Sequence, residues 1–281
     1  MEIQLGKFNQ LEIVKEVDFG QYLDGGEFGE ILLPKRYVDK SLTLGDVINV
    51  FLYLDSEERL IATTETPLVQ VGQYAYLEVA WVNQYGAFMN WGLMKDLFVP
   101  FGEQREKMIK GRKYVIYAYI DDASYRIVAS SKLDSFIKKP EPSALTIEEP
   151  VDLLVWDKTD LGYKVIVNNL YSGLIYSNEV FQTIDIGMSL QGFIQQIRPD
   201  GKIDVALQRS GVENIVEFAD VLFQKLKETD NGFLPFHDKS NAEDIYRNFK
   251  VSKKTFKRGV GDLYKKRLIN LLPHGIELIK K

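Results

Sequence analysis

The sequence predicts a mainly β protein with a C-terminal α+β module: three tandem five-stranded barrels followed by a small helical domain. The first observation behind this fold class is an internal repeat with strand-like alternation, and the second is a basic helical segment after the last repeat. Landmark residues recur at offsets of 66 and then 76 positions. A constant offset across several landmarks indicates a duplicated structural unit. The matching landmarks are Gly20, Pro34 and Gly45, then Gly86, Pro100, Gly111 and Arg126, then Gly162, Gly187 and Lys202.

Each repeat is expected to hold five short antiparallel strands. In the first repeat, residues 13–17, 29–34, 47–54 and 59–63 read as strands, with Ile48 and Val50 on one alternating face. Glycine residues between these strands suit a closed barrel, whose strands must bend sharply. The alternative fold is a small β-sandwich, but a repeat of this length holds too few strands for two sheets.

Three glycines of the repeats, Gly20, Gly86 and Gly162, each follow a large apolar side chain. We expect each to permit a β-bulge that bends the strand and turns its neighbours outward. The neighbouring aromatic residues are Phe19 and Tyr22 in the first repeat and Tyr85, Phe88 and Trp91 in the second.

A basic residue recurs at the last hairpin of each repeat, as Arg59, Arg126 and Lys202. Aromatic rings on a barrel face supply stacking surfaces for unpaired bases, and a nearby cation holds the phosphates. The alternative is that these rings fill the barrel cores. Because a core has no need of the cation, the pairing of rings with basic groups favours an exposed face for single-stranded nucleic acid.

The expected domains are residues 1–66, 67–139 and 151–210 for the barrels, 140–150 for a proline-containing linker, and 211–281 for the C-terminal domain. The last domain opens with an amphipathic helix, because Ile215, Phe218, Leu222 and Leu226 follow the helical period. A capping box at Ser240 begins a second helix.

Ser252 is expected to cap a third helix, with Phe256, Val260, Leu263 and Tyr264 inward. A short hairpin around Pro273 closes the domain. Three helices and a hairpin describe a winged helix-turn-helix whose third helix is in the recognition position. Its candidate nucleic-acid-binding residues are Lys253, Lys254, Lys257, Arg258 and Lys265. A protein-docking module, or lysines that are merely solvated, is the competing interpretation.

The net charge of −5 conceals an asymmetry along the chain. Residues 250–281 hold ten Lys or Arg against two acidic residues, which favours a C-terminal end that faces a polyanion. There is no cysteine and there are only two histidines, so thiolate metal sites, disulfides and His-based triads are poorly supplied. We expect no metal, no cofactor, no small-molecule substrate, no membrane span and no signal peptide, hence a cytoplasmic protein.

Two segments carry a resemblance to the RNA-binding repeat of ribosomal protein S-one, an oligonucleotide-binding (OB-fold) barrel. Phe19-Gly20-Gln21-Tyr22 and Tyr85-Gly86-Ala87-Phe88 match its aromatic-Gly-x-aromatic strand. In the third repeat, residues 173–176 match the Gly-Leu-Val element, with Tyr176 where that family usually has histidine. The resemblance implies RNA contacts at the matching positions, Tyr176 included. The first two repeats depart from the family's middle element. In the third repeat, Arg198 stands where the family has an aspartate on the last hairpin.

Over nearly the whole chain, the order of three barrels and a winged helix resembles the conserved virulence factor B family of bacterial RNA-binding regulators. Its most specific segments here are residues 86–97, 236–246 and 252–257. The resemblance implies a non-enzymatic RNA-binding protein that regulates gene expression after transcription. A DNA-binding transcriptional regulator led by the winged helix is the alternative, and an RNA hydrolase is a third hypothesis that the residue inventory disfavours.

Overall fold

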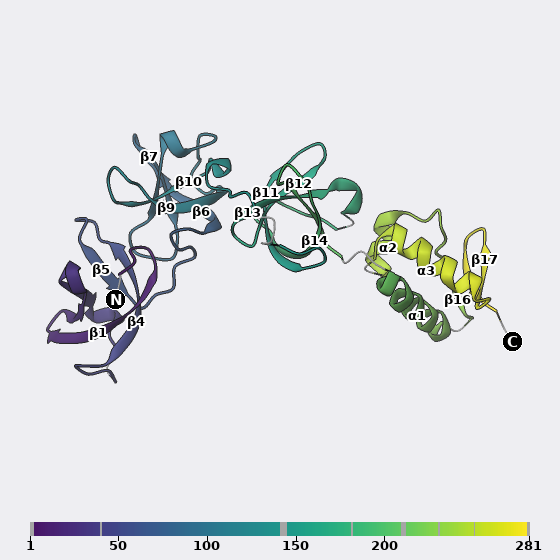
Figure 1. The fold of residues 1–281 in the computed structure, drawn as a ribbon, viewed down its shortest axis with the longest axis horizontal. Helices are drawn as coiled ribbons and strands as arrows, with labels where there is room; N and C mark the ends of the chain where they lie inside the picture. The colour runs from purple at the N-terminus through teal and green to yellow at the C-terminus, as the bar shows by residue number, and fades with distance from the viewer. Residues whose placement is uncertain are drawn as a thin grey trace. The chain divides into compact units, whose positions relative to one another are not determined.

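The structure is a computed structural model that describes residues 3–39, 41–140, 145–180, 182–208, 212–229, 231–249 and 251–279. It divides into two compact units, residues 1–137 and 138–281. The first unit holds two barrels, and the second holds a barrel and a helical module (Figure 1). The predicted fold class is confirmed, because each of the three barrels closes from five strands.

All three barrels have one strand order, in which the third strand pairs with the fifth and the fourth closes onto the first. Barrel 1 contains β1 (Phe8–Val17), β2 (Gly20–Asp24), β3 (Glu30–Pro34), β4 (Val47–Leu54) and β5 (Leu60–Thr63). Barrel 2 contains β6 (Tyr74–Val82), β7 (Gly86–Asn90), β8 (Leu97–Pro100), β9 (Lys113–Ile120) and β10 (Ile127–Ser130). Barrel 3 contains β11 (Pro150–Lys158), β12 (Gly162–Val167), β13 (Tyr171–Tyr176), β14 (Ser189–Ile197) and β15 (Ile203–Ala206).

The first strand of each barrel carries a β-bulge at the same position of the repeat. The register between the first and second strands shifts across Val14 in barrel 1, Ala80 in barrel 2 and Trp156 in barrel 3. These three residues are separated by the same offsets of 66 and 76 as the sequence landmarks. A bulge bends its strand and re-aims the side chains after it. The bulges therefore belong to the strand before the glycines to which the sequence assigned them, and that assignment is wrong.

The glycines that open β2, β7 and β12 serve a close backbone approach instead. A Cβ atom on Gly20 would collide with the carbonyl oxygen of Leu33 in β3. A Cβ atom on Gly86 would meet the carbonyl oxygen of Val99 in β8, and Gly162 has the same relation to β13. Only glycine lets the backbones come this near. The repeated glycines are thus part of the barrel scaffold.

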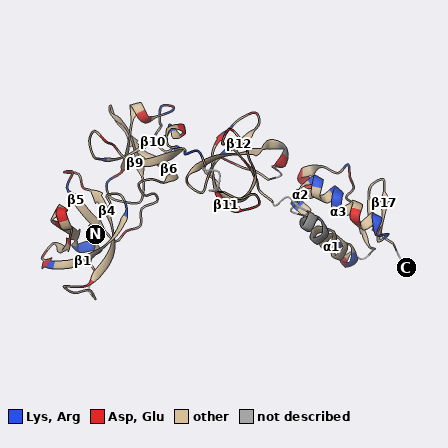
Figure 2. Ribbon diagram, in the orientation of Figure 1, with Lys and Arg blue, Asp and Glu red and all other residues tan. Residues whose placement is uncertain are grey.

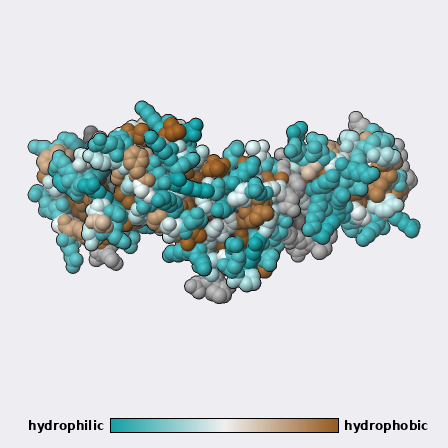
Figure 3. All heavy atoms as spheres, turned by 90° about the horizontal axis from the view of Figure 1, so that it is seen from above, coloured by the Kyte–Doolittle hydropathy of each residue, from teal (hydrophilic) through white to brown (hydrophobic). Residues whose placement is uncertain are grey.

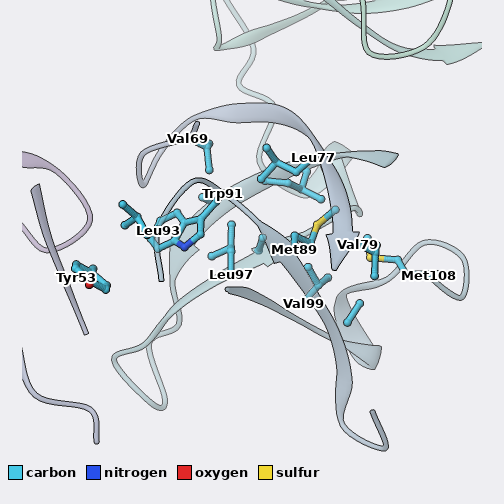
Figure 4. Close-up of a cluster of buried hydrophobic side chains, with 14 of the residues drawn as sticks. Tyr53, Val69, Leu77, Val79, Met89, Trp91, Leu93, Leu97, Val99 and Met108 are labelled. Atoms are coloured by element: carbon cyan, nitrogen blue, oxygen red, sulfur yellow. The ribbon is translucent and has the colours of Figure 1, made fainter. Parts of the chain in front are cut away.

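Barrels 1 and 2 share a hydrophobic core inside the N-terminal unit. Phe51 and Tyr53 lie on the outward face of β4, yet they are 0% and 4% exposed, because they pack with the interior of barrel 2. Phe51 meets the Trp91 ring edge-on at 5.8 Å between centroids. Figure 4 shows Trp91, Met89 and Leu97 inside barrel 2, with Tyr53 arriving from a strand of the neighbouring barrel. The second half of β4, from Val50 to Tyr53, is therefore buried on both faces.

The described part of the predicted linker 140–150 contributes to barrel 3. Leu145 belongs to the core of this barrel, and the backbone of Glu148 donates to the carbonyl of Ile194 at 2.8 Å. Pro150 already begins β11. Residues 141–144 lie outside the described residues, as do Ser210 and Gly211 at the predicted boundary to the last domain.

The C-terminal module contains α1 (Val212–Glu228), α2 (Ala242–Phe249) and α3 (Lys253–Lys265). It also has a small sheet of β16 (Phe233–Leu234), β17 (Ile269–Leu272) and β18 (Gly275–Leu278) in the order β16-β18-β17. Phe218 of α1 and Phe256 of α3 are buried in the common core, and Gly259 lets the two helices approach closely. The three predicted helices and the closing hairpin are all present.

Two details of these helices differ from the prediction. The side chain of Asn241, not that of Ser240, accepts the N–H of Glu243 and caps α2, while Ser240 accepts the N–H of His237. Tyr264 was expected to point inward but is 54% exposed. The predicted cap of α3 is confirmed, because the Ser252 hydroxyl accepts the N–H of Thr255 at 3.0 Å.

Candidate nucleic-acid interface

A pocket of about 810 Å³ opens over the face of barrel 2, beside the β4–β5 hairpin of barrel 1. Both barrels lie in the N-terminal unit. In Figure 3, apolar atoms interrupt the hydrophilic surface of this half of the chain. The sequence-predicted residues Tyr85, Phe88, Trp91 and Arg126 all line the pocket. The other lining residues are Tyr53, Leu54, Glu58, Trp81, Met94, Lys95, Asp96, Leu97, Phe98, Ile127 and Val128.

Three aromatic rings form a row across β6, β7 and β8, which we call the ring row: Trp81, Phe88 and Phe98. Trp81 pairs with Phe88 across the strands, and Phe88 pairs with Phe98. The Trp81 and Phe88 rings stack at 3.7 Å between centroids with 3° between planes, and Phe98 follows at 4.9 Å. The bulge at Ala80 sets this register, because β6 skips that residue before Trp81. The row is an apolar, flat-sided surface on the outside of the barrel.

The edge of the ring row carries a carboxylate and a further ring. The Trp81 indole N–H donates to Asp96 Oδ2 at 2.8 Å, which fixes the orientation of the indole. Trp81 remains 41% exposed, so one side of the ring row is open to solvent. Tyr85 is 66% exposed in the β6–β7 turn, whose backbone is held by the side chain of Asn83. Together these groups offer stacking surfaces beside a fixed hydrogen-bond acceptor.

Two cations of barrel 2 meet one carboxylate of barrel 1 at the pocket. Glu58 Oε2 lies 3.1 Å from Arg126 Nε, and Glu58 Oε1 lies 3.2 Å from Lys95 Nζ. The Lys95 ammonium also donates to the carbonyl of Asp55 at 2.7 Å. The Arg126 side chain is 56% exposed, so solvent reaches it beside the ion pair. The predicted neighbourhood of rings and a basic group is therefore present in barrel 2, with Lys95 added to it.

Trp91 does not join the exposed rings beside which it was expected. It is 3% exposed, and its indole N–H donates to the carbonyl of Lys95 at 2.6 Å. Its place in the core, under the loop that carries Lys95, makes it a support for the pocket rather than a stacking surface. The alternative that aromatic residues fill the core holds for Trp91.

Barrel 1 presents a sparser face. Phe19 is 57% exposed and meets Tyr22 edge-on at 6.3 Å, while the Lys15 ammonium lies 5.3 Å from the Tyr22 ring centre. Arg59 forms ion pairs with Asp55 at 2.8 Å and with Glu57 at 2.9 Å. Partial burial works against ionisation of Asp55, but hydrogen bonds from the backbone and side chain of Arg59 hold the pKa of this carboxyl below its usual value. Both ion-pair partners of Arg59 thus lie in its own hairpin.

Barrel 3 replaces rings with ion pairs. Arg198 binds Asp204 through Nε at 3.0 Å and through Nη2 at 2.8 Å, and Arg198 also donates to the Tyr176 hydroxyl. Lys202 pairs with Asp200 at 3.0 Å. The candidate residues Tyr176 and Lys202 lie in barrel 3, where the structure gives them these partners.

The three basic residues that the sequence matched do occupy one structural position. In each barrel, the hairpin before the last strand is closed by a backbone hydrogen bond to the carbonyl of that basic residue. The donors and acceptors are Asp55 and Arg59 at 2.9 Å, Asp121 and Arg126 at 2.9 Å, and Arg198 and Lys202 at 2.8 Å. Arg198 therefore stands where barrels 1 and 2 have aspartate.

The basic face of α3 is exposed as the spacing predicts. Lys254, Lys257, Arg258 and Lys265 are exposed, Lys253 is partly buried, and the opposite face of the helix is buried in the module core. Figure 2 shows basic positions, in blue, along the ribbon of α3. A row of cations on a helix that stands in the recognition position can lie along a phosphate backbone.

Sequence reasoning missed Trp81, Phe98, Lys95, Asp96 and Glu58 as site residues. Two signals could have found the rings: Phe98 stands ten residues after Phe88, within reach of a hairpin, and Trp81 lies in the strand just before the turn that carries Tyr85. Glu58 could not have been found, because its contacts join two barrels. Its neighbours are set by tertiary packing and not by spacing along the chain.

The acidic and histidine side chains of two turns, Asp121 and His237, form local hydrogen bonds. No cluster of three or more His, Asp or Glu that could hold a metal ion occurs among the described residues. Asp121 accepts hydrogen bonds from the hydroxyl and N–H of Ser124, which lower the pKa of its carboxyl and give it a turn-forming role. His237 Nδ1 accepts the N–H of Lys239 at 3.2 Å. No described helix has the length and apolar character needed to cross a bilayer.

Comparison with family models matches both ends of the chain. Residues 5–65 match the S1 domain, the barrel of ribosomal protein S-one, and residues 220–278 match the CvfB-like winged helix domain. The fold and these matches define a class of modular proteins that combine oligonucleotide-binding barrels with a winged helix. Both kinds of domain are nucleic-acid-binding modules.

Relatives match along nearly the whole chain. Conserved virulence factor B of Staphylococcus epidermidis is 26% identical over 99% of this chain and 95% of its own. The uncharacterized protein YitL of Bacillus subtilis is 27% identical over 91% of this chain and 87% of its own. A multidomain protein with nucleic acid binding domains from Streptococcus pneumoniae has 24% identity, 98% coverage of both chains and a TM-score of 0.42. The chain is thus similar to conserved virulence factor B along nearly its whole length, as the sequence predicts, and its C-terminal module matches the CvfB-like winged helix domain.

Proposed function

We propose that this protein binds single-stranded RNA on the face of barrel 2 and regulates gene expression after transcription, without catalysing a reaction. The observation that carries the proposal is the ring row beside Lys95 and Arg126. Each stacked base contributes about 1–3 kcal/mol in proteins of this kind, and the stacking is tolerant of sequence. The proposal places the protein in the cytoplasm, where transcripts are available to it.

An unpaired strand fits this surface better than a duplex does. The Trp81 ring lines the open pocket, is 41% exposed, and needs a base whose own face is free. In a double helix those faces are covered by neighbouring pairs, so a duplex offers the ring row no partner. The two cations lie at the edge of the pocket, where they can meet the backbone of a strand whose bases are on the rings.

The winged helix supports the proposal as an electrostatic anchor. Its exposed cations on α3 belong to a segment with ten Lys or Arg against two acidic residues. Such contacts attract any nucleic acid and weaken steeply as salt rises, with a slope of about −0.7 per phosphate for single strands. We propose that α3 raises overall affinity while barrel 2 selects for unpaired bases.

The test is binding of the full chain to fluorescently labelled single-stranded RNA, single-stranded DNA and duplex DNA of matched length, each over a salt series. We expect the tightest binding for single-stranded RNA and a loss of affinity in Trp81→Ala. The matched control is Leu174→Ala, which alters the equivalent row of barrel 3. Equal binding of Trp81→Ala and the parent protein would refute the barrel 2 assignment.

The exposed basic face of α3 favours a second candidate, a DNA-binding regulator led by the winged helix. This candidate requires duplex DNA to bind more tightly than single-stranded RNA at every salt concentration. It also requires the affinity to depend on Arg258 and not on the ring row. The same titrations therefore decide between the two.

A further inference from the structure

One carboxylate holds both basic groups of the pocket at once. Glu58 directs Oε1 to Lys95 at 3.2 Å and Oε2 to Arg126 at 3.1 Å. The carboxylate comes from barrel 1, while both cations belong to barrel 2. Lysine and arginine placed to share two oxygens of a single anion are a common way to bind a phosphate, which offers two non-bridging oxygens with a similar spread. The carboxylate thus stands where an anionic ligand would be held.

These ion pairs are exposed and easily exchanged. The side chains of Glu58 and Lys95 are each 36% exposed, and that of Arg126 is 56% exposed. Exposed ion pairs contribute little to stability, because water competes for both partners. A phosphodiester of a bound strand, delivered at high local concentration by bases on the ring row, can therefore displace the carboxylate.

The hairpin that carries Glu58 does not depend on these pairs for its shape. The backbone of Asp55 donates to the carbonyl of Arg59 at 2.9 Å, and the Asp55 side chain accepts the N–H of Glu57 at 2.8 Å. The Asp55 carbonyl also keeps its own contact with Lys95 at 2.7 Å. The Glu58 side chain can swing away while the turn stays folded.

We propose that Lys95 and Arg126 form a subsite for one phosphodiester group of the strand bound on barrel 2, and that Glu58 occupies this subsite in the free protein. The inference rests on the proposed function and deepens it, because it names the chemistry that the subsite recognises. Binding exchanges an internal carboxylate for a phosphate, so Glu58 lowers the affinity for RNA and discourages weak, purely electrostatic attachment at the pocket.

The test compares Glu58→Gln with Glu57→Gln in the full chain, by titration of a labelled single-stranded RNA at fixed salt. Both variants remove one negative charge from the same turn, but Glu57 pairs with Arg59 and not with the two pocket cations. We expect Glu58→Gln to bind about three- to tenfold more tightly than the parent, the effect of removing two exposed ion pairs. We expect Glu57→Gln to stay within about twofold of the parent.

A second measurement locates the phosphate. Oligonucleotides in which one linkage at a time is an uncharged methylphosphonate are titrated against the parent and Arg126→Ala. We expect one linkage whose replacement weakens binding to the parent more than binding to Arg126→Ala, in which Lys95 alone remains at the subsite. The salt slope of Arg126→Ala should also be smaller, by at most about 0.7, the contribution of one phosphate contact.

The outcomes distinguish a failure of the phosphate subsite from a failure of RNA binding on barrel 2. If Trp81→Ala weakens binding but Glu58→Gln and Glu57→Gln bind alike, or no linkage shows the expected pattern, the subsite is wrong and Glu58 is a latch between the barrels. If Trp81→Ala has no effect, the proposed function fails first. Weaker binding by a folded Glu58→Gln, checked by its thermal unfolding, also overturns the subsite.

Discussion

Barrels 2 and 3 have the same strand order, the same bulge and the same glycine, but they present opposite chemistry at one row of positions. In barrel 2 the row across the first three strands is Trp81, Phe88 and Phe98. In barrel 3 the paired residues are Asp157, Lys164 and Leu174, and the Asp157 carboxylate lies 3.9 Å from the Lys164 ammonium. Repetition has kept the scaffold while the face has diverged.

Barrel 1 falls between the two. Its row is Lys15, Tyr22 and Leu32, in which the lysine lies over the tyrosine ring. Barrel 1 thus has one ring and one cation in the row, where barrel 2 has three rings packed against one another. The comparison teaches that the recurring glycines indicate how each barrel is built. The chemistry of each barrel face depends instead on the residues between those glycines.

The largest effect should come from the shared scaffold. Gly86→Ala and Gly162→Ala each place a Cβ against a carbonyl oxygen of the neighbouring strand. We expect each to lower the free energy of unfolding by about 2–4 kcal/mol, because backbone must move. Denaturant unfolding measures this. Gly26→Ala is the control for changing a glycine, because nothing lies within 4 Å of its added Cβ. In Gly26→Ala only the strain of a positive φ would lower the stability. Equal losses of unfolding free energy in all three variants would contradict the role of Gly86 and Gly162 in close backbone approach.

The next effect exchanges the faces. The double variant Trp81→Asp with Phe88→Lys gives barrel 2 the ion pair of barrel 3. We expect it to fold and to lose about 1–3 kcal/mol of binding to single-stranded RNA, because the exposed Trp81 ring and the Phe88 ring stacked against it are removed. The control is Asp157→Ala with Lys164→Ala, which should leave affinity unchanged. Unaltered affinity in the exchanged variant would show that the row does not mark the binding barrel.

A smaller effect tests the winged helix. Lys254→Ala with Arg258→Ala should reduce the salt slope of RNA binding by about 1.4, if each residue meets one phosphate. The charge-matched control is Lys158→Ala with Lys202→Ala on barrel 3, where Lys202 is already paired with Asp200. Identical slopes for the two double variants would assign α3 another role.

The smallest effect concerns Tyr176, whose hydroxyl accepts from Arg198. Tyr176→Leu removes this contact and should cost about 1 kcal/mol of stability by thermal unfolding. We expect RNA affinity to change by less than about twofold, since this residue lacks a row of rings beside it. A larger loss in a folded variant would bring barrel 3 into the binding face.

The fold was largely predictable because local patterns determine it. The offsets of the glycines gave the three barrels, and the helical period with Ser252 gave α3. The sites were predictable in part: Phe88 and Arg126 do line one pocket. The prediction that Trp91 shares the exposed face with Phe88 was wrong. The two residues are three positions apart, and an odd separation along an extended chain puts two side chains on opposite faces.

The remaining site residues depend on contacts that sequence spacing does not encode. Trp81 reaches Phe88 only because β6 bulges at Ala80. Glu58 meets Lys95 and Arg126 because two barrels pack together, and nothing in its own turn signals that. Tyr264 lies at the margin of the apolar face of α3, where a small rotation of the helix decides between core and solvent.

The burial of Phe51 and Tyr53 between the first two barrels has a consequence for how this half of the chain folds. Because these side chains complete a core that belongs to the neighbouring barrel, the two should melt in one cooperative transition. An excised second barrel would lose that cover and expose an apolar patch. The same packing of barrel 1 against barrel 2 therefore also places the β4–β5 hairpin beside the pocket.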